Sequence, residues 1–257
     1  MEDRIQHQFT VKAPTYDRSA SWVTDPGLLQ AYLDACRVPP DASLLDVCCG
    51  TGIVGGAFRG RVDHLFGLDV TEAMLGLARQ RLDVCRKGSA YALPFDSDSF
   101  DIVIGRSSWH LLEFPEKAVA EMYRVARPGA QLLYGHRVPY GPVDAAWMEK
   151  IFLKKQPLAL RFYREEELTA AIQAAGFGNV STSDYPQWEL IDRWIDTHET
   201  PQEAREIIRD LYRTASPEIR KAHPSEVRAN GETWDCWRWV IFSAWKPAPQ
   251  HQYTGEF

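Results

Sequence analysis

The chain has 257 residues and a mass of 29.3 kDa, which fits one or two domains whose core needs no disulfide or metal support. A hydrophobic fraction of 45% and a charged fraction of 25% exclude the disordered, collagen-like and coiled-coil classes. The net charge of −6 leaves no broad basic surface, so we expect no nucleic-acid partner.

Three further features favour a cytoplasmic protein. The first residues, MEDRIQHQFT, do not have the cationic patch and apolar stretch of a secretory signal. No apolar run approaches the roughly 20 residues that span a bilayer, so we expect no membrane partner. The five cysteines include no CxxC pair and therefore predict neither a disulfide framework nor a zinc ribbon.

Residues 1–40 predict an arm followed by one helix. Residues 1–25 have no pattern of an autonomous unit, and we expect them to fold onto the body of the protein. Pro26 then opens an apolar-periodic stretch that predicts a helix, which Pro39 and Pro40 end.

From residue 43 onward, short apolar runs alternate with helical patterns. Strands are predicted at 44–48, 64–68, 102–104 and 132–134, and helices at 52–58, 71–82 (with Thr71 as a cap) and 116–126. This alternation is typical of a parallel sheet covered on both faces, so residues 41–136 predict a doubly wound α/β core. Ligands of such a core bind beyond the carboxyl ends of the strands.

The C-terminal half is less regular. We expect a lid insertion at 137–164 with a helix at 143–155, and a core helix and sixth strand within 165–185. A helical cap insertion with about three short helices follows at 186–232, and the last strand and tail at 233–257. Lys150, Lys154 and Lys155 are interpreted as part of a solvated helix face.

The segment LLDVCCGTGIVG at 44–55 places glycines directly after the first predicted strand. Gly50, Gly52 and Gly55 match the pattern GxGxxG, in which the backbone can approach a ligand and the next helix begins with unpaired N–H groups. Asp69 ends the neighbouring predicted strand, where a carboxylate can accept both hydroxyls of a ribose. Together they predict a nucleoside-bearing cofactor, either NAD or S-adenosyl-L-methionine (SAM). When the glycines are considered without Asp69, a tight turn that binds no ligand explains them as well.

Four ordered segments resemble the class I SAM-dependent methyltransferases, in particular the ubiquinone- and menaquinone-type small-molecule enzymes. They are DVCCGTG at 46–52, GLD with AML within 67–75, AYALPF with SFD within 90–101, and EMYRVARPG at 121–129. The resemblance implies a Rossmann-like, seven-stranded, mostly parallel sheet with helices on both faces, an antiparallel last strand and helical lid insertions. It also implies SAM as the cofactor and methyl transfer to an O, N or C atom of a small aromatic or carboxylated metabolite.

By this resemblance, the arm and helix at 1–40 cover the cofactor pocket. The expected cofactor-binding residues are Tyr16, Asp46, Cys48, Gly50, Thr51, Gly52, Asp69, Val70, Met74, Ser89, Ala90, Gly105 and Arg106. Two positions depart from the family pattern: Ser89 replaces an acid that many relatives use near the adenine amino group, and Cys48 stands where glycine is commoner. Tyr16 is interpreted as a lid over the pocket or as a core residue.

Methyl transfer requires an aligned acceptor, exclusion of water and, for weak nucleophiles, removal of a proton. His110 and His136 follow the fourth and fifth predicted strands, and the ordinary pKa of histidine suits a base near neutrality. We expect His110 to be the base and His136 to act in catalysis or contact the substrate, although packing explains either ring as well. No third ligand has metal-site spacing, so we expect no metal.

Trp109, Arg137 and Tyr140 are predicted to bind the substrate. Arg106 and Arg137 can grip a carboxylate or phosphate, although an ion pair explains each arginine as well. The aromatic insertion at 186–232 predicts either a cap or subunit contact that shapes an aromatic or apolar pocket, or a small satellite core. The expected partner is a small-molecule substrate, and a homodimer is left open.

Two other functions explain parts of the pattern. An NAD-dependent dehydrogenase explains the glycine turn, but no Tyr-xxx-Lys pair accompanies Tyr91, Tyr134 or Tyr163. A SAM-binding protein that catalyses a non-methylating reaction or acts as a regulatory partner fits the same residues. Nucleic-acid or protein-amide methylation is disfavoured, because no Asn/Asp-Pro-Pro-Tyr/Phe segment follows the fourth strand.

Overall fold

The computed structural model describes residues 1–37, 39–197 and 200–248. Its strands form one mixed sheet in the order β3-β2-β1-β4-β5-β8-β6, with β7 paired to β8 beside this path. The strands are β1 (Ser43–Val47), β2 (His64–Asp69), β3 (Val84–Lys87), β4 (Phe100–Arg106), β5 (Ala126–Val138), β6 (Gly178–Leu190), β7 (Ser225–Val227) and β8 (Thr233–Trp245). The predicted sheet is confirmed, with the short β7 as an additional strand.

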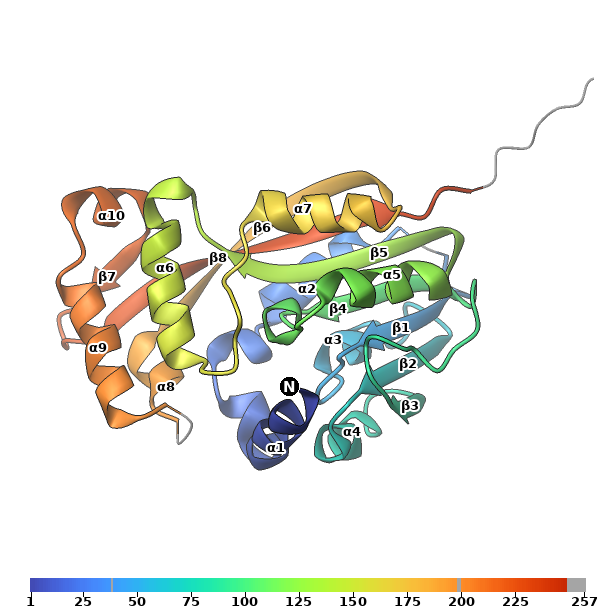
Figure 1. Ribbon diagram of the computed structural model, residues 1–257, viewed down its shortest axis with the longest axis horizontal. Coiled ribbons are helices and arrows are strands. Elements are labelled where there is room, and N and C mark those ends of the chain that lie inside the picture. The colour runs from blue at the N-terminus through green and yellow to red at the C-terminus, as the bar shows by residue number, and fades with distance from the viewer. Residues whose placement is uncertain (38, 198–199, 249–257) are drawn as a thin grey trace, which may run out of the picture.

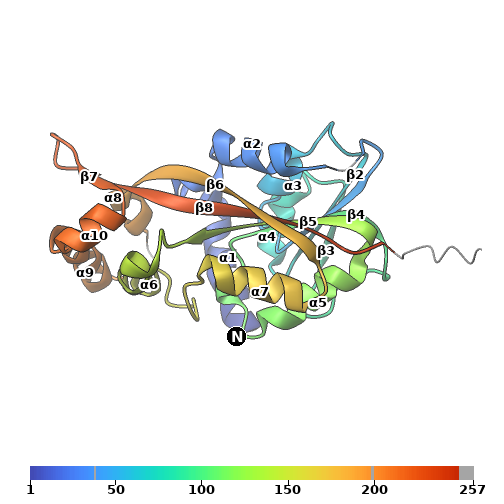
Figure 2. The same cartoon turned by 90° about the horizontal axis from the view of Figure 1, so that it is seen from above.

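Helices cover both faces of this sheet, as predicted (Figures 1 and 2). The helices are α1 (Glu2–Lys12), α2 (Pro26–Ala35), α3 (Ile53–Ala57), α4 (Glu72–Ala78), α5 (Pro115–Val125), α6 (Pro142–Lys155), α7 (Glu165–Ala174), α8 (Ile191–Ile195), α9 (Gln202–Arg213) and α10 (Pro217–Ala222). In Figure 2, α2 and α3 lie on one side of the sheet, and α5 and α7 lie on the other.

Successive strand residues feed two separate cores. Leu44 packs in the core that includes α2 and α3, whereas Leu45 packs in the core that includes α5 and α7. Side chains along a strand alternate between faces, so a strand that is buried on both faces needs a continuous apolar run. This requirement explains the apolar texture of residues 44–47 and 102–104. Because β1 is parallel to β2 and β4, the carboxyl ends of these strands lie at one edge of the sheet.

The antiparallel end of the sheet is much longer than the sequence pattern predicts. β6 runs to Leu190, beyond the predicted boundary at residue 185, and β8 runs over Thr233–Trp245 where only 236–242 has a clear strand composition. Their pairing is continuous from Ser181 opposite Ser243 to Leu190 opposite Trp234. The paired strands extend past the parallel strands and support α6, α8, α9, α10 and β7 at one end of the molecule (Figure 1).

The helices after β1 and β2 are shorter than predicted. α3 begins only after Gly52, whose φ of +75° is incompatible with a helix, and ends at Ala57 instead of residue 58. α4 ends at Ala78 instead of residue 82, because Gln80 and Arg81 donate to carbonyls three residues back and tighten the chain into a turn. Thr71 is the N-cap residue of α4 but makes no side-chain capping hydrogen bond.

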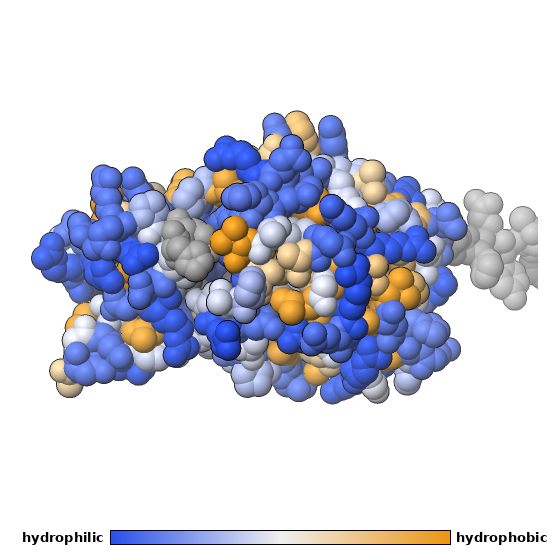
Figure 3. All heavy atoms as spheres, turned by 90° about the horizontal axis from the view of Figure 1, so that it is seen from below, coloured by the Kyte–Doolittle hydropathy of each residue, from blue (hydrophilic) through white to orange (hydrophobic). Residues whose placement is uncertain are grey.

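Seen from below, the surface is mainly hydrophilic, with apolar residues in small groups (Figure 3). Exposed apolar side chains such as Val143 and Val227 stand on separate elements, which is ordinary for a folded chain. Within residues 1–37, 39–197 and 200–248, no helix is long and apolar enough to cross a bilayer. The predicted tail beyond residue 248 lies outside the described residues.

A buried hydrogen-bond network connects the helical insertion to the sheet. His223 lies between two carboxylates: its Nδ1 is 2.8 Å from Asp144 on α6, and its Nε2 is 2.5 Å from Asp235 on β8. Asp235 also accepts hydrogen bonds from Tyr212 on α9 and from the Trp237 indole. Burial lowers the pKa of His223, but the hydrogen bonds to both carboxylates outweigh it and raise the pKa to about 9. The imidazole is therefore protonated at neutral pH.

This arrangement predicts a loss of stability in alkaline solution. Because the folded-state pKa of His223, about 9, exceeds the ordinary value of 6.5, its contribution is complete below pH 6.5 and is lost as the pH rises through 9. The pKa difference corresponds to roughly 3 kcal/mol of folding free energy. Denaturant unfolding between about pH 6 and pH 10 should show this decline in the parent protein and a flatter profile in His223→Gln. The exposed His7→Gln control should follow the parent, and identical profiles in all three proteins would contradict the assignment.

Candidate functional site

The turn between β1 and α3 has three residues in the left-handed region. φ is +58° at Cys48, +54° at Gly50 and +75° at Gly52. A residue with a side chain adopts this conformation at a cost of roughly 1 to 2 kcal/mol, which explains why glycine is the commoner choice at position 48. Asp46, buried near the end of β1, accepts the Gly55 N–H at 2.9 Å and holds the start of α3 in place. Burial raises the pKa of this carboxyl to about 7.

Asp69 joins this turn to the end of β2. One carboxylate oxygen accepts the Gly50 N–H at 2.9 Å, and the other accepts the Thr71 N–H at 2.8 Å. Burial raises the pKa of Asp69, and the backbone hydrogen bonds from Thr71 and Gly50 oppose that shift. Each oxygen keeps a lone pair for a further donor, because a carboxylate oxygen can accept two hydrogen bonds.

The N-terminal arm is fastened over the same turn. Asp17 accepts a hydrogen bond from the Thr51 hydroxyl at 2.6 Å and forms an ion pair with Arg81 at 2.9 Å, while Arg81 also donates to the Thr51 carbonyl oxygen. The adjacent Tyr16 lies above Gly50, where an added Cβ would be 4.0 Å from its ring. Burial raises the pKa of the Tyr16 hydroxyl to about 12, so it stays protonated.

Helix α1 closes the other side of this region. The Ser89 hydroxyl donates to Glu2 Oε1 at 2.5 Å, which brings a carboxylate from α1 beside the position where the family pattern has an acid. The sequence analysis missed Glu2, because no local pattern predicts a contact across 87 positions of the chain. Ile5 and Phe9 of α1 line the same region.

These elements enclose a first cavity, which we call the cofactor cavity. It is lined by Glu2, Ile5, Phe9, Tyr16, Cys48, Gly50, Asp69, Val70, Thr71, Gly88, Ala90, Arg106, Ser107, Ser108, Leu111 and Leu112. Seven of the predicted cofactor-binding residues are therefore brought together here. The other six do not line it: Asp46, Thr51, Gly52, Met74, Ser89 and Gly105. Met74 is buried in the core, and the Gly105 carbonyl oxygen accepts from Tyr32.

The side chain of Arg106 holds the arm. Its guanidinium donates to the Val23 carbonyl oxygen at 2.8 Å and lies 5.1 Å from the Trp22 ring centroid. The sequence left two roles open for this arginine, an anion grip and an ion pair; Arg106 makes no ion pair with a described residue, and the anion grip stays a prediction. Arg106 positions the segment that leads into the second cavity.

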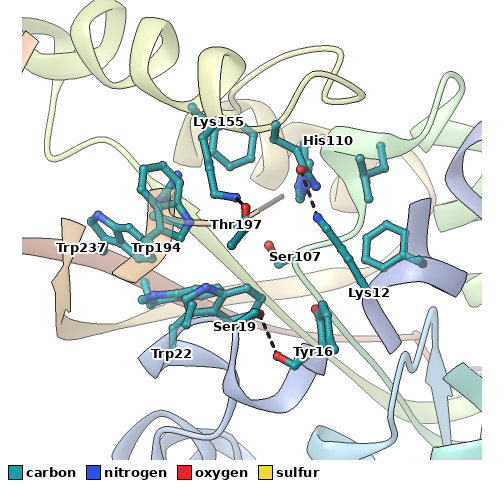
Figure 4. Close-up of a pocket in the computed structure, with 17 residues that line it drawn as sticks. Lys12, Tyr16, Ser19, Trp22, Ser107, His110, Lys155, Trp194, Thr197 and Trp237 are labelled. Atoms are coloured by element: carbon teal, nitrogen blue, oxygen red, sulfur yellow. Dashed lines mark hydrogen bonds between the residues drawn. The ribbon is translucent and has the colours of Figure 1, made fainter. Parts of the chain in front are cut away.

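A second cavity of about 100 Å³ adjoins the first, and we call it the aromatic pocket (Figure 4). It is lined by Phe9, Lys12, Tyr16, Ser19, Ala20, Trp22, Ser107, His110, Leu111, Arg137, Phe152, Lys155, Gln156, Trp194, Thr197, Trp237 and Trp239. Four of these residues, Phe9, Tyr16, Ser107 and Leu111, also line the cofactor cavity. Two adjoining cavities with a shared wall can hold two reacting molecules side by side.

His110 lines the aromatic pocket, and His136 lies directly behind it. His136 Nδ1 is 2.8 Å from the Arg137 carbonyl oxygen, which can only accept, so this nitrogen carries the proton. His136 Nε2 is therefore an acceptor, and it lies 3.4 Å from His110 Nδ1, which must donate. This assignment leaves the lone pair of His110 on Nε2.

Both imidazoles are neutral at physiological pH. Burial lowers the pKa of His136 to about 4, and burial together with the neighbouring His136 and Arg137 places the pKa of His110 well below its ordinary value. The loop that carries His110 is fixed from β5, because the Tyr134 hydroxyl accepts the N–H groups of Ser108 and Trp109 at 3.1 and 3.0 Å.

The predicted substrate-binding residues are placed differently from one another. Arg137 lines the aromatic pocket, whereas Trp109 stacks on Tyr134 in the core with ring centroids 4.3 Å apart. Tyr140 lies outside the pocket and donates to the Cys236 thiol. The interpretation of Lys155 as a solvated residue was wrong: it is 6% exposed and donates to Thr197, because the insertion packs over the end of α6.

Comparisons with known proteins are consistent with this geometry. A family profile described as a methyltransferase domain matches residues 45–134. The chain is 30% identical over 208 residues to an uncharacterized methyltransferase, YcgJ, of Bacillus subtilis, which covers 77% of this chain and 80% of the relative. It is also 30% identical over 212 residues to a demethylmenaquinone methyltransferase of Lactiplantibacillus plantarum, which covers 68% of this chain and 88% of the relative.

A solved structure has the same fold. The crystal structure of YcgJ from Bacillus subtilis aligns with a TM-score of 0.77 at 24% identity, over 86% of this chain and 98% of that chain. At this identity the likeness shows the shared fold.

The fastening of the arm is testable. Asp17→Ala removes both the Thr51 hydrogen bond and the Arg81 ion pair, so we expect faster amide hydrogen exchange in residues 2–18 with little change in the sheet. Glu72→Ala, which breaks an exposed ion pair with Arg79 on α4, is the matched control and should leave the arm unchanged. Unchanged exchange of the arm in Asp17→Ala would show that other contacts hold it.

Proposed function

Because the chain belongs to the class I SAM-dependent methyltransferases, we propose that it transfers a methyl group from SAM to a small molecule bound in the aromatic pocket. SAM is the cofactor. The observation that carries the proposal is the wall shared by the two cavities, since it brings a bound acceptor next to a bound cofactor. Such positioning is the main requirement of an in-line methyl transfer.

The residues of the cofactor cavity fit an adenosyl compound. Gly50 has no side chain where the turn faces Tyr16, so the backbone there stays accessible to a ligand. Asp69 has carboxylate lone pairs for the hydroxyls of a ribose, and Glu2 with Ser89 offers polar atoms near the expected adenine edge. We infer that these residues, with Tyr16 as a cover, bind the cofactor. When bound, SAM supplies an activated methyl group whose leaving group needs no acid.

The aromatic pocket supports an acceptor with an aromatic or apolar body. Rings of Trp22, Trp194, Trp237 and Trp239 line it together with Phe152. Such walls exclude water. The absence of water prevents hydrolysis of the reactive groups and strengthens the electrostatic interactions that act on them. One of the relatives above is named for action on demethylmenaquinone, and transfer to an aromatic ring compound fits this chain as well.

We infer that His110 removes the proton of the acceptor through Nε2. The hydrogen bond from its Nδ1 to His136 orients the ring, and the hydrogen bond from His136 Nδ1 to the Arg137 carbonyl fixes both tautomers. His136 is then a positioning residue. Burial lowers the pKa of His110 and keeps the ring unprotonated at neutral pH. Because a lower pKa also weakens a base, the role of His110 depends on its position beside the acceptor.

The proposed activity is tested by binding and by turnover. Calorimetry should show that SAM and its demethylated product bind and that NAD does not, and Asp69→Asn should weaken both SAM species by about tenfold or more. Methyl-labelled SAM should then label one or more compounds in a metabolite extract. Tight SAM binding without any labelled product would favour a non-methylating reaction, and binding of NAD alone would overturn the proposal.

The role of His110 predicts a specific change in rate. His110→Asn should lower kcat by about 10² to 10⁴ for an acceptor that loses a proton, with unchanged affinity for SAM. Since the base is neutral far below pH 6.5, kcat/KM of the parent should show no histidine-dependent decrease from pH 8 down to about 6. His64→Asn, an exposed surface change, is the control. A fully active His110→Asn would remove this residue as the base.

A further inference from the structure

Arg137 is a buried cation whose side chain has no polar partner within residues 1–37, 39–197 and 200–248. It is 4% exposed and lines the aromatic pocket, yet its guanidinium makes no hydrogen bond or ion pair with any residue that the structure describes. An arginine carries five N–H donors, and each buried donor that stays unpaired costs about 1 to 3 kcal/mol. Such a residue is maintained more readily where a ligand supplies the missing acceptor.

A second unpaired donor lies beside it. Trp239 on β8 is the direct cross-strand partner of Arg137 on β5, so the two side chains point to the same face of the sheet. The Trp239 Nε1–H is buried and has no hydrogen-bond partner among the described residues, and Trp239 also lines the aromatic pocket. Two neighbouring strands therefore direct unpaired donors toward one cavity.

Contacts with aromatic rings do not replace these hydrogen bonds. The Cζ atom of Arg137 is 3.9 Å from the Trp237 ring centroid and 4.9 Å from those of Trp194 and Phe152. Cation–π attraction acts on the face of the guanidinium, whereas its N–H donors lie in the plane and point past the rings. The rings hold the cation in place and leave its hydrogen-bonding edge for another group.

The buried carboxylate of Asp235 is already engaged. Asp235 accepts hydrogen bonds from Tyr212 and Trp237 on one oxygen and lies 2.5 Å from His223 on the other. Burial lowers the pKa of Arg137 to about 10, and Asp235 opposes this shift. The guanidinium is therefore charged at neutral pH. It attracts an anion that none of the described residues supplies.

On the basis of the proposed function, we propose that the methyl acceptor carries a carboxylate on an aromatic or apolar body, and that Arg137 and Trp239 bind this carboxylate. A carboxylate presents two oxygens in one plane, which match the planar fork of a guanidinium. With the anionic end held between β5 and β8, the rest of the acceptor extends along the aromatic walls toward the wall shared with the cofactor cavity. Arg137 is thus a specificity-determining residue, separate from His110.

The test compares isosteric probes on the full-length protein saturated with S-adenosylhomocysteine. Benzoate should bind about tenfold or more tightly than its neutral isostere benzamide, as measured by calorimetry or by quenching of tryptophan fluorescence. Phenyl phosphate tests which kind of anion the site prefers. If it binds more tightly than benzoate, the preferred group is a phosphate, and the carboxylate proposal is overturned. Equal binding of benzoate and benzamide, or binding of neither, would overturn it as well.

Variants show which residues cause the preference for benzoate over benzamide. Arg137→Gln should abolish the preference for benzoate over benzamide, Arg137→Lys should retain part of it, and Trp239→Phe should weaken benzoate more than benzamide. Trp188→Phe, at an exposed position on β6, is the matched control and should behave as the parent. Retention of the preference in a folded Arg137→Gln protein would overturn the assignment. If Arg137→Gln does not fold, the parent comparison and Trp239→Phe still decide the outcome.

The binding of S-adenosylhomocysteine separates this inference from the proposed function. That affinity is measured first and should be the same in all variants, because neither Arg137 nor Trp239 lines the cofactor cavity. Failure of the parent to bind S-adenosylhomocysteine would contradict the methyltransferase proposal. Normal cofactor binding without a preference for the acid would contradict only the carboxylate inference.

Discussion

The site depends on one carboxylate that connects two neighbouring strand ends. Asp69 accepts the amide hydrogens of Gly50 and Thr71, so the turn after β1 and the turn after β2 are held at a fixed separation. Of the three left-handed residues in the first turn, only Cys48 carries a side chain, so its conformation depends on the surrounding contacts, whereas the two glycines adopt theirs readily. The arm then lies on this turn through Asp17, and the arm in turn forms part of both cavities.

The second constraint is the length of β6 and β8. A Rossmann-like sheet needs no more than a few residues in each of its last strands, but here the pair continues past the parallel strands and carries the helical insertion with it. The pairing of β5 with β8 brings Arg137 and Trp239 into register, and Trp194 and Trp237 lie around the guanidinium. The antiparallel end and its insertion therefore supply Trp194, Trp237 and Trp239 to the walls of the aromatic pocket, while the arm and the loop after β4 supply the side next to the cofactor cavity.

The core was predictable because its signals are local. Continuous apolar runs, the glycines after β1 and Asp69 after β2 all act within a few residues, and they predicted the sheet and a nucleoside-binding turn. The family resemblance supplied most of the seven predicted residues among the sixteen that line the cofactor cavity. The rest depends on contacts between distant segments. Glu2 meets Ser89 across the fold, and Lys155 is buried only because the insertion folds back on α6, so its polar helical pattern was misleading. Likewise, Met74 and Trp109 were assigned to the site by position along the chain, while their burial is decided by layers that the pattern does not reveal.

Tyr16 belongs to the boundary between the two cavities, and this position links their occupancies. If a guest on one side displaces the phenol ring, the volume and contacts offered to the guest on the other side change with it. By thermodynamic reciprocity, the factor by which the first guest alters the affinity of the second equals the factor in the opposite direction. Because one side chain forms part of both walls, any displacement of Tyr16 by one ligand changes the affinity of the other.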